Sequence, residues 1–150
     1  MVVPSSTRFD TTTAKKLIKE FEGCRLKVYH CTAGKATIGY GHLCKEDQVP
    51  ITQAEAELLL DEDIKIRAKD LSKVLKSVSL LVTNNEFSAM LSLMFNIGTE
   101  AFKNSTLLRL FLVGEIDGAA DEFLKWKFVQ GKEEKGLLRR RKKERLIFLD

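Results

Sequence analysis

One short segment, EGCRLKVYHCTAGKATIGYGH from Glu22 to His42, places an acid, a thiol and a hydroxyl close together in the chain. Eight residues separate Glu22 from Cys31, and five separate Cys31 from Thr37. A protonated carboxyl can donate to a leaving oxygen, while a second group stabilises or attacks the cation that develops. Cleaving an acetal such as a glycosidic bond needs that pair of roles. Taken alone, however, a Glu at a helix end is most often a surface residue.

The placement of Glu22 follows from the helix expected before it. Thr11 to Thr13 can cap a helix that begins near Ala14. Glu22 comes one turn after Ile18 and falls near the apolar face, whereas Glu20 points about 160° away and should be solvated. Gly23 is expected to end the helix. The apolar face is formed by Ala14, Leu17, Ile18 and Phe21.

The pattern changes between residues 25 and 40. RLKVY alternates polar and apolar residues, and TAG and ATIGYG supply a turn and a β-branched run, which indicates a small β-sheet or hairpin. Gly39 and Gly41 are expected to serve the backbone of a tight turn. Residues 43–50 are expected to form a loop.

The rest of the chain is predicted to be helical. Thr52 and Glu55 form a capping box before a long helix, and Thr83 and Glu86 repeat it before a buried central helix that Gly98 closes. Further helices are expected at 105–114, 117–127 and 137–149. The long helix should bury Leu58, Leu59, Ile64, Ala68, Leu71 and Leu75.

Composition points to one globular domain without a membrane segment. The chain has 150 residues, of which 44% are hydrophobic and 31% charged, and its net charge of +4 favours an anionic partner. Cys24, Cys31 and Cys44 are an odd set that we expect to be free thiols in a reducing cytosol. The opening MVVPSSTRFDTTTAKK has no apolar run long enough for a signal peptide or membrane anchor.

Metal and nucleic-acid binding are not expected. The histidines and cysteines lack CxxC or HExxH spacing, so we predict no metal and no cofactor. The segment from Lys132 to Arg145 holds eight basic residues and three acids and is interpreted as a solvated helix face. No nucleic-acid motif accompanies this charge.

The motif EG.RLK.Y...AG..TIGYGH resembles the active-site segment of the phage-type lysozymes, glycoside hydrolase family 24, which carry Glu, then Asp or Cys, then Thr at this spacing. The resemblance covers roughly residues 14–149. It continues in IT...AE.LL..D from Ile51 to Asp63, in FNIGTEAFKNSTLL from Phe95 to Leu108, and in GLLRRRKKE with Trp126 upstream.

The resemblance implies an α+β, predominantly helical fold of the phage-lysozyme type. A small N-terminal β-containing lobe and a larger C-terminal helical lobe would flank an active-site cleft. Residues 1–150 would form a single domain. Within it, 1–13 would be an N-terminal extension, about 14–51 the first helix and β lobe, and about 52–150 the interlobe helix and helical lobe.

The resemblance also implies a muramidase that hydrolyses the β-1,4 bond between N-acetylmuramic acid and N-acetylglucosamine in peptidoglycan during host cell lysis. Glu22 would be the general acid and Thr37 would help place the attacking water. Asn96 and Leu43 would contact substrate, although Asn96 could equally be a helix-end cap. His42, otherwise a possible acid-base group, would pair structurally with an acid that aligns with Asp63.

Cys31 stands where many relatives have Asp, and its role stays open. A neutral thiol leaves desolvation to supply most of any rise in the pKa of Glu22. A thiolate, favoured by Arg25, Lys27 and His30 nearby, could act as base or nucleophile, and either form could orient water. The family is mostly inverting, but the cysteine leaves the stereochemistry undecided.

Two alternatives to the muramidase remain. A lytic transglycosylase works with one essential Glu and leaves an anhydro sugar, and a peptidoglycan-binding protein could have lost catalysis with the Asp. The expected partner is the peptidoglycan glycan strand, which part of the basic run would attract. We expect a monomer, held in the host cytoplasm until a holin or other pore releases it to the periplasm or cell wall.

Overall fold

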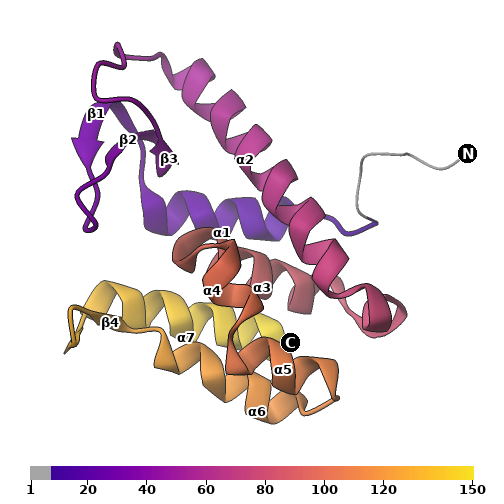
Figure 1. The fold of residues 1–150 in the computed structure, drawn as a ribbon. Coiled ribbons are helices and arrows are strands. Elements are labelled where there is room, and N and C mark those ends of the chain that lie inside the picture. The colour runs from indigo at the N-terminus through magenta and orange to yellow at the C-terminus, as the bar shows by residue number, and fades with distance from the viewer. Residues whose placement is uncertain (1–7) are drawn as a thin grey trace, which may run out of the picture.

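The computed structural model describes residues 8–150 as an N-terminal helix, a small sheet and a series of further helices (Figure 1). The first elements are α1 (Thr12–Glu22), β1 (Arg25–His30), β2 (Ala36–Gly39), β3 (His42–Leu43) and α2 (Gln53–Val74). They are followed by the 3-10 helix η1 (Lys76–Leu81), α3 (Asn84–Ile97), α4 (Thr99–Lys103), α5 (Thr106–Leu112) and α6 (Ile116–Glu122). The chain ends with η2 (Phe123–Lys125), β4 (Phe128–Val129), β5 (Lys132–Glu133) and α7 (Lys135–Leu149).

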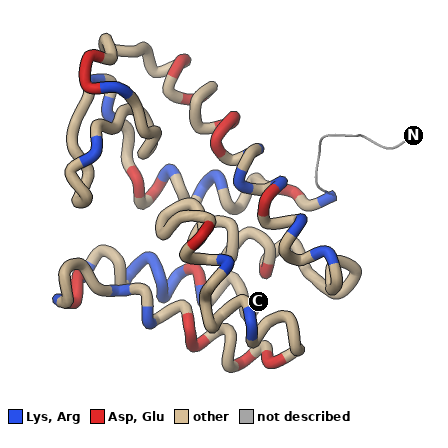
Figure 2. The backbone as a smooth tube through the Cα atoms, in the orientation of Figure 1, with Lys and Arg blue, Asp and Glu red and all other residues tan. Residues whose placement is uncertain are grey.

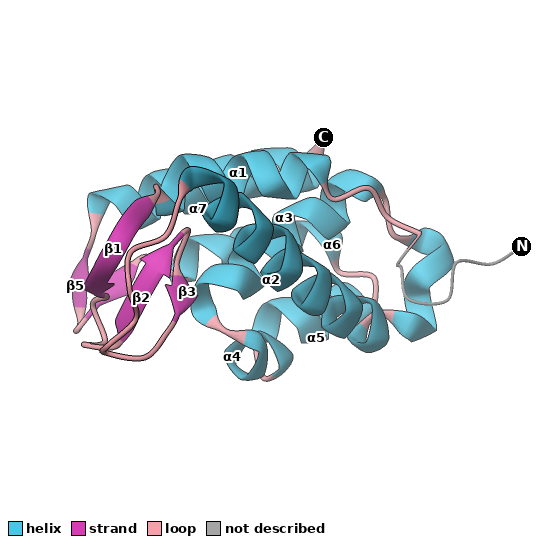
Figure 3. Cartoon of the chain, turned by 90° about the horizontal axis from the view of Figure 1, so that it is seen from above, coloured by secondary structure: helices cyan, strands magenta, loops and turns pink. Residues whose placement is uncertain are grey.

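The sheet and the helical body lie at opposite ends of the long helix α2 (Figures 1 and 3). The sheet is antiparallel with strand order β1-β2-β3. Helix α2 packs on β2 and β3 and also reaches α3 and α4, while α1 packs on α3 and α7. The predicted α+β, mainly helical class is therefore confirmed, and α1 and α2 connect the sheet to the helical body.

Both predicted capping boxes are present and fix where α2 and α3 begin. The Thr52 hydroxyl accepts from the Glu55 amide at 3.1 Å, and the Glu55 carboxylate accepts from the Thr52 amide at 2.9 Å. Thr83 and Glu86 exchange the same two bonds at 3.0 and 2.9 Å. Each box satisfies two amides that would otherwise lack partners at the helix start, so these boundaries are local properties of the sequence.

The core surrounds α3, whose residues from Phe87 to Met94 are all buried, as the apolar pattern predicted. Phe9 stacks on Phe87 with ring centroids 4.2 Å apart, so part of the predicted extension 1–13 contributes to the core. Residues 1–7 lie outside the described residues, and with them part of the segment expected to hold no signal peptide. No helix between Arg8 and Asp150 is long and apolar enough to cross a membrane.

The predicted buried stripe of α2 was wrong at its start. Leu58 is 65% exposed, and Leu59 is half-buried. The buried face is instead Ala56, Leu60, Ile64, Ala68 and Leu71. Successive members of that set are three or four residues apart, so they form one continuous face of the helix.

The C-terminal part departs from the sequence prediction in two ways. The helix expected at 117–127 ends at Glu122, and the strands β4 and β5 form a hairpin that the sequence reading missed. Helix α7 begins at Lys135, where the Glu134 carboxylate caps it by accepting two backbone amides. Although Lys and Arg are frequent along α7 (Figure 2), its Arg140, Arg141 and Glu144 are buried, so the interpretation of this run as a solvated face was wrong there.

Candidate active site

Glu22 is the last residue of α1 and points toward α7. Gly23 ends the helix with φ of 69°, as predicted. The Glu22 side chain is 18% exposed, and Arg140 Nη1 donates to its Oε2 at 2.7 Å. Glu20 is exposed and accepts from Lys143 at 2.6 Å, so the two acids do lie in different environments. Of these two acids, Glu22 is the one that combines partial burial with access to solvent and a fixed orientation.

Gly41 allows the Glu22 carboxylate to lie against the turn between β2 and β3. A Cβ added at Gly41 would come 2.9 Å from Glu22 Oε1 and 3.4 Å from Cδ. The φ of Gly41 is +77°, a conformation that residues with a side chain rarely adopt. The glycine therefore serves both the predicted turn and the close approach of the acid to the sheet.

Thr37 lies inside β2 and is only 2% exposed. Its hydroxyl donates to the Lys35 carbonyl at 2.8 Å. Thr37 pairs with Tyr29 on β1 and with Leu43 on β3. Leu43 itself is 56% exposed, so its side chain is available to a ligand beside the strand that carries Thr37.

Cys31 begins the turn that joins β1 to β2. Its backbone amide donates to the Lys35 carbonyl at 3.0 Å, and its carbonyl accepts from Gly34 at 2.8 Å. The pKa of the half-buried thiol lies below its usual value, first because the backbone amides of Lys35 and Ala33 face the sulfur. The main cause is therefore turn geometry rather than the cationic side chains nearby in the sequence.

The pKa of the Tyr29 phenol is affected by the charges of both Glu22 and Cys31. Burial raises the pKa of its phenol, and the charge of Glu22 raises it further, with a smaller contribution from Cys31. Arg25 lies over its ring at 4.8 Å and opposes the rise. Within residues 8–150, no hydrogen bond or ion pair joins Glu22 to Cys31 directly.

Polar contacts from His42 and Tyr40 join the sheet region to α2. His42 Nδ1 lies 2.7 Å from Asp63 Oδ2, the pairing that was predicted. Glu57 accepts from Lys19 and from the Tyr40 hydroxyl, and these contacts, Lys19 first, lower the pKa of its carboxyl to about 2. The Glu57 contacts were not predicted, since they unite three elements that lie far apart in the sequence.

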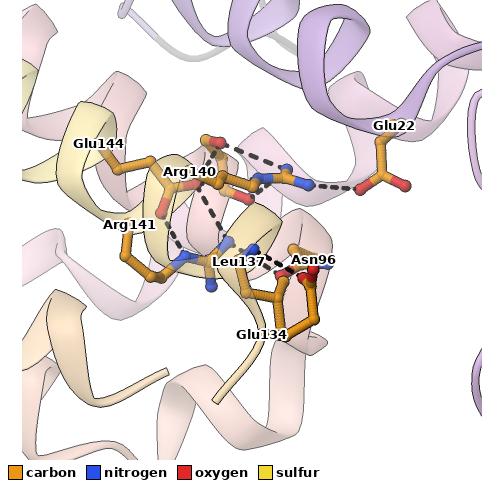
Figure 4. A network of polar contacts seen from close by, with 8 residues as sticks. Glu22, Asn96, Glu134, Leu137, Arg140, Arg141 and Glu144 are labelled. Atoms are coloured by element: carbon orange, nitrogen blue, oxygen red, sulfur yellow. Dashed lines mark hydrogen bonds and ion pairs between the residues drawn. The ribbon is translucent and has the colours of Figure 1, made fainter. Parts of the chain in front are cut away.

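A buried charged network continues from Glu22 into the helical body (Figure 4). Arg140 Nε donates to Glu144 at 3.2 Å, and Arg141 Nε lies 2.9 Å from the same carboxylate. Arg141 Nη2 then donates to Asn96 Oδ1 at 2.9 Å. Burial raises the pKa of the Glu144 carboxyl, which both arginines oppose, and lowers that of Arg141 to about 10.

This network was not predicted, although the spacing of its residues in the sequence is a signal for it. Arg140 and Arg141 stand four and three residues before Glu144, the spacing of ion pairs on one helix face. The structure thus brings Glu22 and Asn96 to the two ends of one network, while Cys31, Thr37 and Leu43 belong to the sheet. Among the residues described, no three His, Cys, Asp or Glu side chains gather as a metal site would require.

Comparison with known proteins gives a consistent result. The family model described as phage lysozyme matches residues 19–144. An endolysin of Acyrthosiphon pisum secondary endosymbiont phage 1 is 43% identical over 137 residues, covering 88% of this chain and 92% of the relative. The solved muramidase domain of SpmX from Asticaccaulis excentricus has a TM-score of 0.83 at 31% identity, with 95% of this chain and 99% of that chain covered. A P22 lysozyme mutant has a TM-score of 0.74 at 36% identity, with 96% and 100% covered.

Proposed function

The chain belongs to the phage lysozyme family, and we propose on that premise that it is a muramidase cutting the β-1,4 bond between N-acetylmuramic acid and N-acetylglucosamine. Family membership makes it a glycoside hydrolase of the lysozyme type, which hydrolyses peptidoglycan in host cell lysis. The finer assignment of the bond and of the residues that cleave it rests on the arrangement around Glu22.

The observation that carries the proposal is the fixed, partly exposed carboxyl of Glu22. Arg140 occupies Oε2 at 2.7 Å, so Oε1, beside Gly41, is the oxygen left to carry a proton toward a leaving group. With 18% of the side chain exposed, a glycosidic oxygen can reach it. Glu22 therefore protonates the leaving oxygen while positive charge develops on the sugar ring.

Thr37 and Cys31 would act on the opposite face of the sugar. The Thr37 hydroxyl donates to a backbone carbonyl, which leaves its oxygen lone pairs to accept a hydrogen bond from the attacking water. The lowered pKa of Cys31 increases its thiolate fraction near neutral pH, so the sulfur can supply the anion that Asp gives in relatives. In this mechanism Cys31 stabilises the oxocarbenium-like transition state or receives the proton from water.

Substrate binding would use residues on both sides of Glu22. Leu43 presents an exposed apolar side chain on β3, suited to the face of a sugar ring. Asn96 gives its carbonyl oxygen to Arg141, so its amide nitrogen is left to donate to the acetamido group of a sugar. The mild positive charge of the chain, +4, favours approach to the anionic wall.

The decisive experiment compares two conservative variants on the same helix. Glu22→Gln should fold normally and lose almost all lytic activity in a turbidity assay on outer-membrane-permeabilised cells, because glutamine cannot donate the proton. Glu20→Gln should remain near wild type, since it breaks only an exposed ion pair. Equal activity in the two variants would remove Glu22 from the mechanism.

Product analysis separates the muramidase from a lytic transglycosylase. A muramidase leaves reducing sugars, whereas a transglycosylase leaves anhydro ends. The anomeric configuration of the first product then distinguishes inversion from a retaining path in which Cys31 is the nucleophile.

The route to the wall is proposed to depend on a separate pore such as a holin, with the enzyme acting as a monomer. Cells that express only this chain should then stay intact, and cells that also express a pore-forming protein should lyse. Light scattering of the purified protein at assay concentration measures the oligomeric state.

A further inference from the structure

Glu144 is a fully buried carboxylate that no step of the proposed reaction uses. Its side chain is 0% exposed, and it lies on α7 one turn after the buried Arg140 and Arg141, which both contact it. Ser92 of α3 donates to its Oε2 at 2.5 Å. Burying a charged carboxylate is unfavourable unless it is paired and hydrogen-bonded, so this residue is costly for the fold unless the arginines stay in place.

Each arginine spans from Glu144 to one proposed site residue (Figure 4). Arg140 donates through Nε to Glu144, through Nη2 to the Ser92 carbonyl at 3.1 Å, and through Nη1 to Glu22. All three of its nitrogens therefore have a partner. Because the guanidinium is planar, fixing Nε and Nη2 also fixes the direction in which Nη1 points.

Arg141 links Glu144 to Asn96 with fewer hydrogen bonds, because its Nη2 makes the hydrogen bonds and its Nε makes an ion-pair contact. Its Nε lies against Glu144 Oε1, and its Nη2 donates to Asn96 Oδ1 at 2.9 Å. An arginine has no acceptor, so the oxygen of the Asn96 amide must face it, and the amide N–H groups must face away. The orientation of Asn96 as a donor toward ligand thus depends on Arg141.

We propose that Glu144 is a positioning residue, which holds the general acid and the sugar-binding amide in register by anchoring Arg140 against Glu22 and Arg141 against Asn96. This inference rests on the proposed function, since it takes the roles of Glu22 and Asn96 from there. The buried residues of the basic run, Arg140, Arg141 and Glu144, would then serve to position the side chains of the active site.

The two arms of the network predict different kinetic effects, measured on soluble uncrosslinked glycan strands. Arg140→Lys keeps the charge but not the planar fork, so it should act mainly on kcat, by about tenfold or more. Arg141→Lys should act mainly on KM, because the hold on Asn96 is lost. Glu144→Gln, which removes the shared anchor, should lower kcat and raise KM together.

Phe148→Leu is the matched control for a merely structural effect. Phe148 is buried on α7, one turn after Glu144, and packs on Phe111 and Phe123 outside the network. It should lower the melting temperature and leave kcat and KM at 25 °C unchanged. If Glu144→Gln behaves like this control, the positioning role is overturned, even though Glu22→Gln is inactive.

The two lysine variants keep the test valid if Glu144→Gln does not fold. A separation into a kcat effect for Arg140→Lys and a KM effect for Arg141→Lys supports the proposal, and identical effects of the two variants overturn it. Retained activity in Glu22→Gln, by contrast, overturns the proposed function itself, so the two failures are distinguishable.

Discussion

Replacing Gly41 by alanine should damage activity far more than stability. The new Cβ would lie 2.9 Å from Glu22 Oε1, closer than side chains normally approach, and 3.4 Å from Cδ. The carboxylate cannot simply rotate away, because Arg140 holds its other oxygen at 2.7 Å. The acid is therefore expected to shift by several tenths of an ångström and to lose part of its bond to Arg140.

The sizes of the two effects can be worked out separately. Placing alanine at a φ of +77° costs about 1–2 kcal/mol in backbone strain. For a chain of this length that corresponds to a fall in Tm of about 2–8 °C. Misplacing a catalytic group by up to an ångström can lower the rate roughly 10–100-fold. The loss of kcat should therefore exceed what partial unfolding at 25 °C could produce.

Gly114 provides the matched control. Its φ is +83°, and a Cβ there would meet nothing within 4 Å. Gly114→Ala should therefore lower Tm by a similar amount while leaving lysis of permeabilised cells at the wild-type rate. The reasoning is refuted if Gly41→Ala, with the same melting temperature as the control, also matches it in kcat.

Three further outcomes are expected. His42→Asn removes the hydrogen bond between His42 and Asp63, so it should lower the free energy of unfolding by about 1 kcal/mol and leave activity at low temperature unchanged. An unchanged Tm would exclude the structural role of this pair. Cys31 should be alkylated by iodoacetamide at pH 7 before Cys44, because turn amides lower the pKa of the Cys31 thiol and burial raises that of the Cys44 thiol. Mass spectrometry reports the order of modification, and the rate of lysis should fall as Cys31 is modified. The Cys31→Asp variant should be active and should keep its activity after the same treatment. The pKa of the Glu57 carboxyl falls from 4.5 to about 2 on folding, so its stabilising contribution is present above pH 4.5 and is lost as pH falls through 2. The Tm difference between wild type and Glu57→Gln should therefore shrink as pH falls over that interval. A Tm difference that does not depend on pH would contradict the stabilising role of the ionised Glu57.

Local signals in the sequence were reliable where the partners lie within one helical turn. The Thr52–Glu55 and Thr83–Glu86 boxes could be predicted because each bond joins residues three positions apart. The same holds for the end of α1 at Gly23, where the chain needs a positive φ. In α2, however, apolar character predicted Leu58 as buried, although it is 65% exposed, because the neighbours that select a helix face are distant in the chain.

The candidate site shows the same division. The spacing of Glu22, Cys31 and Thr37 was legible in the sequence and indicated the family, and their catalytic roles remain proposals. The groups that surround each of these side chains could not be predicted from the sequence. Cationic side chains were expected to act on Cys31, whereas the main effect comes from backbone amides of its own turn, whose direction depends on the folded geometry.

The sequence by itself determined the succession of α1, the small sheet, α2 and α3, the capped starts of α2 and α3, and the membership of the family, since each is encoded in short segments. Only the tertiary structure decided that Arg140, 118 residues from Glu22, holds the proposed acid. It also decided that Glu144 is buried rather than solvated. A charged residue on a helix has the same local signal in either setting, and the packing of α7 against α3 removes one face from water and makes ion pairs there obligatory.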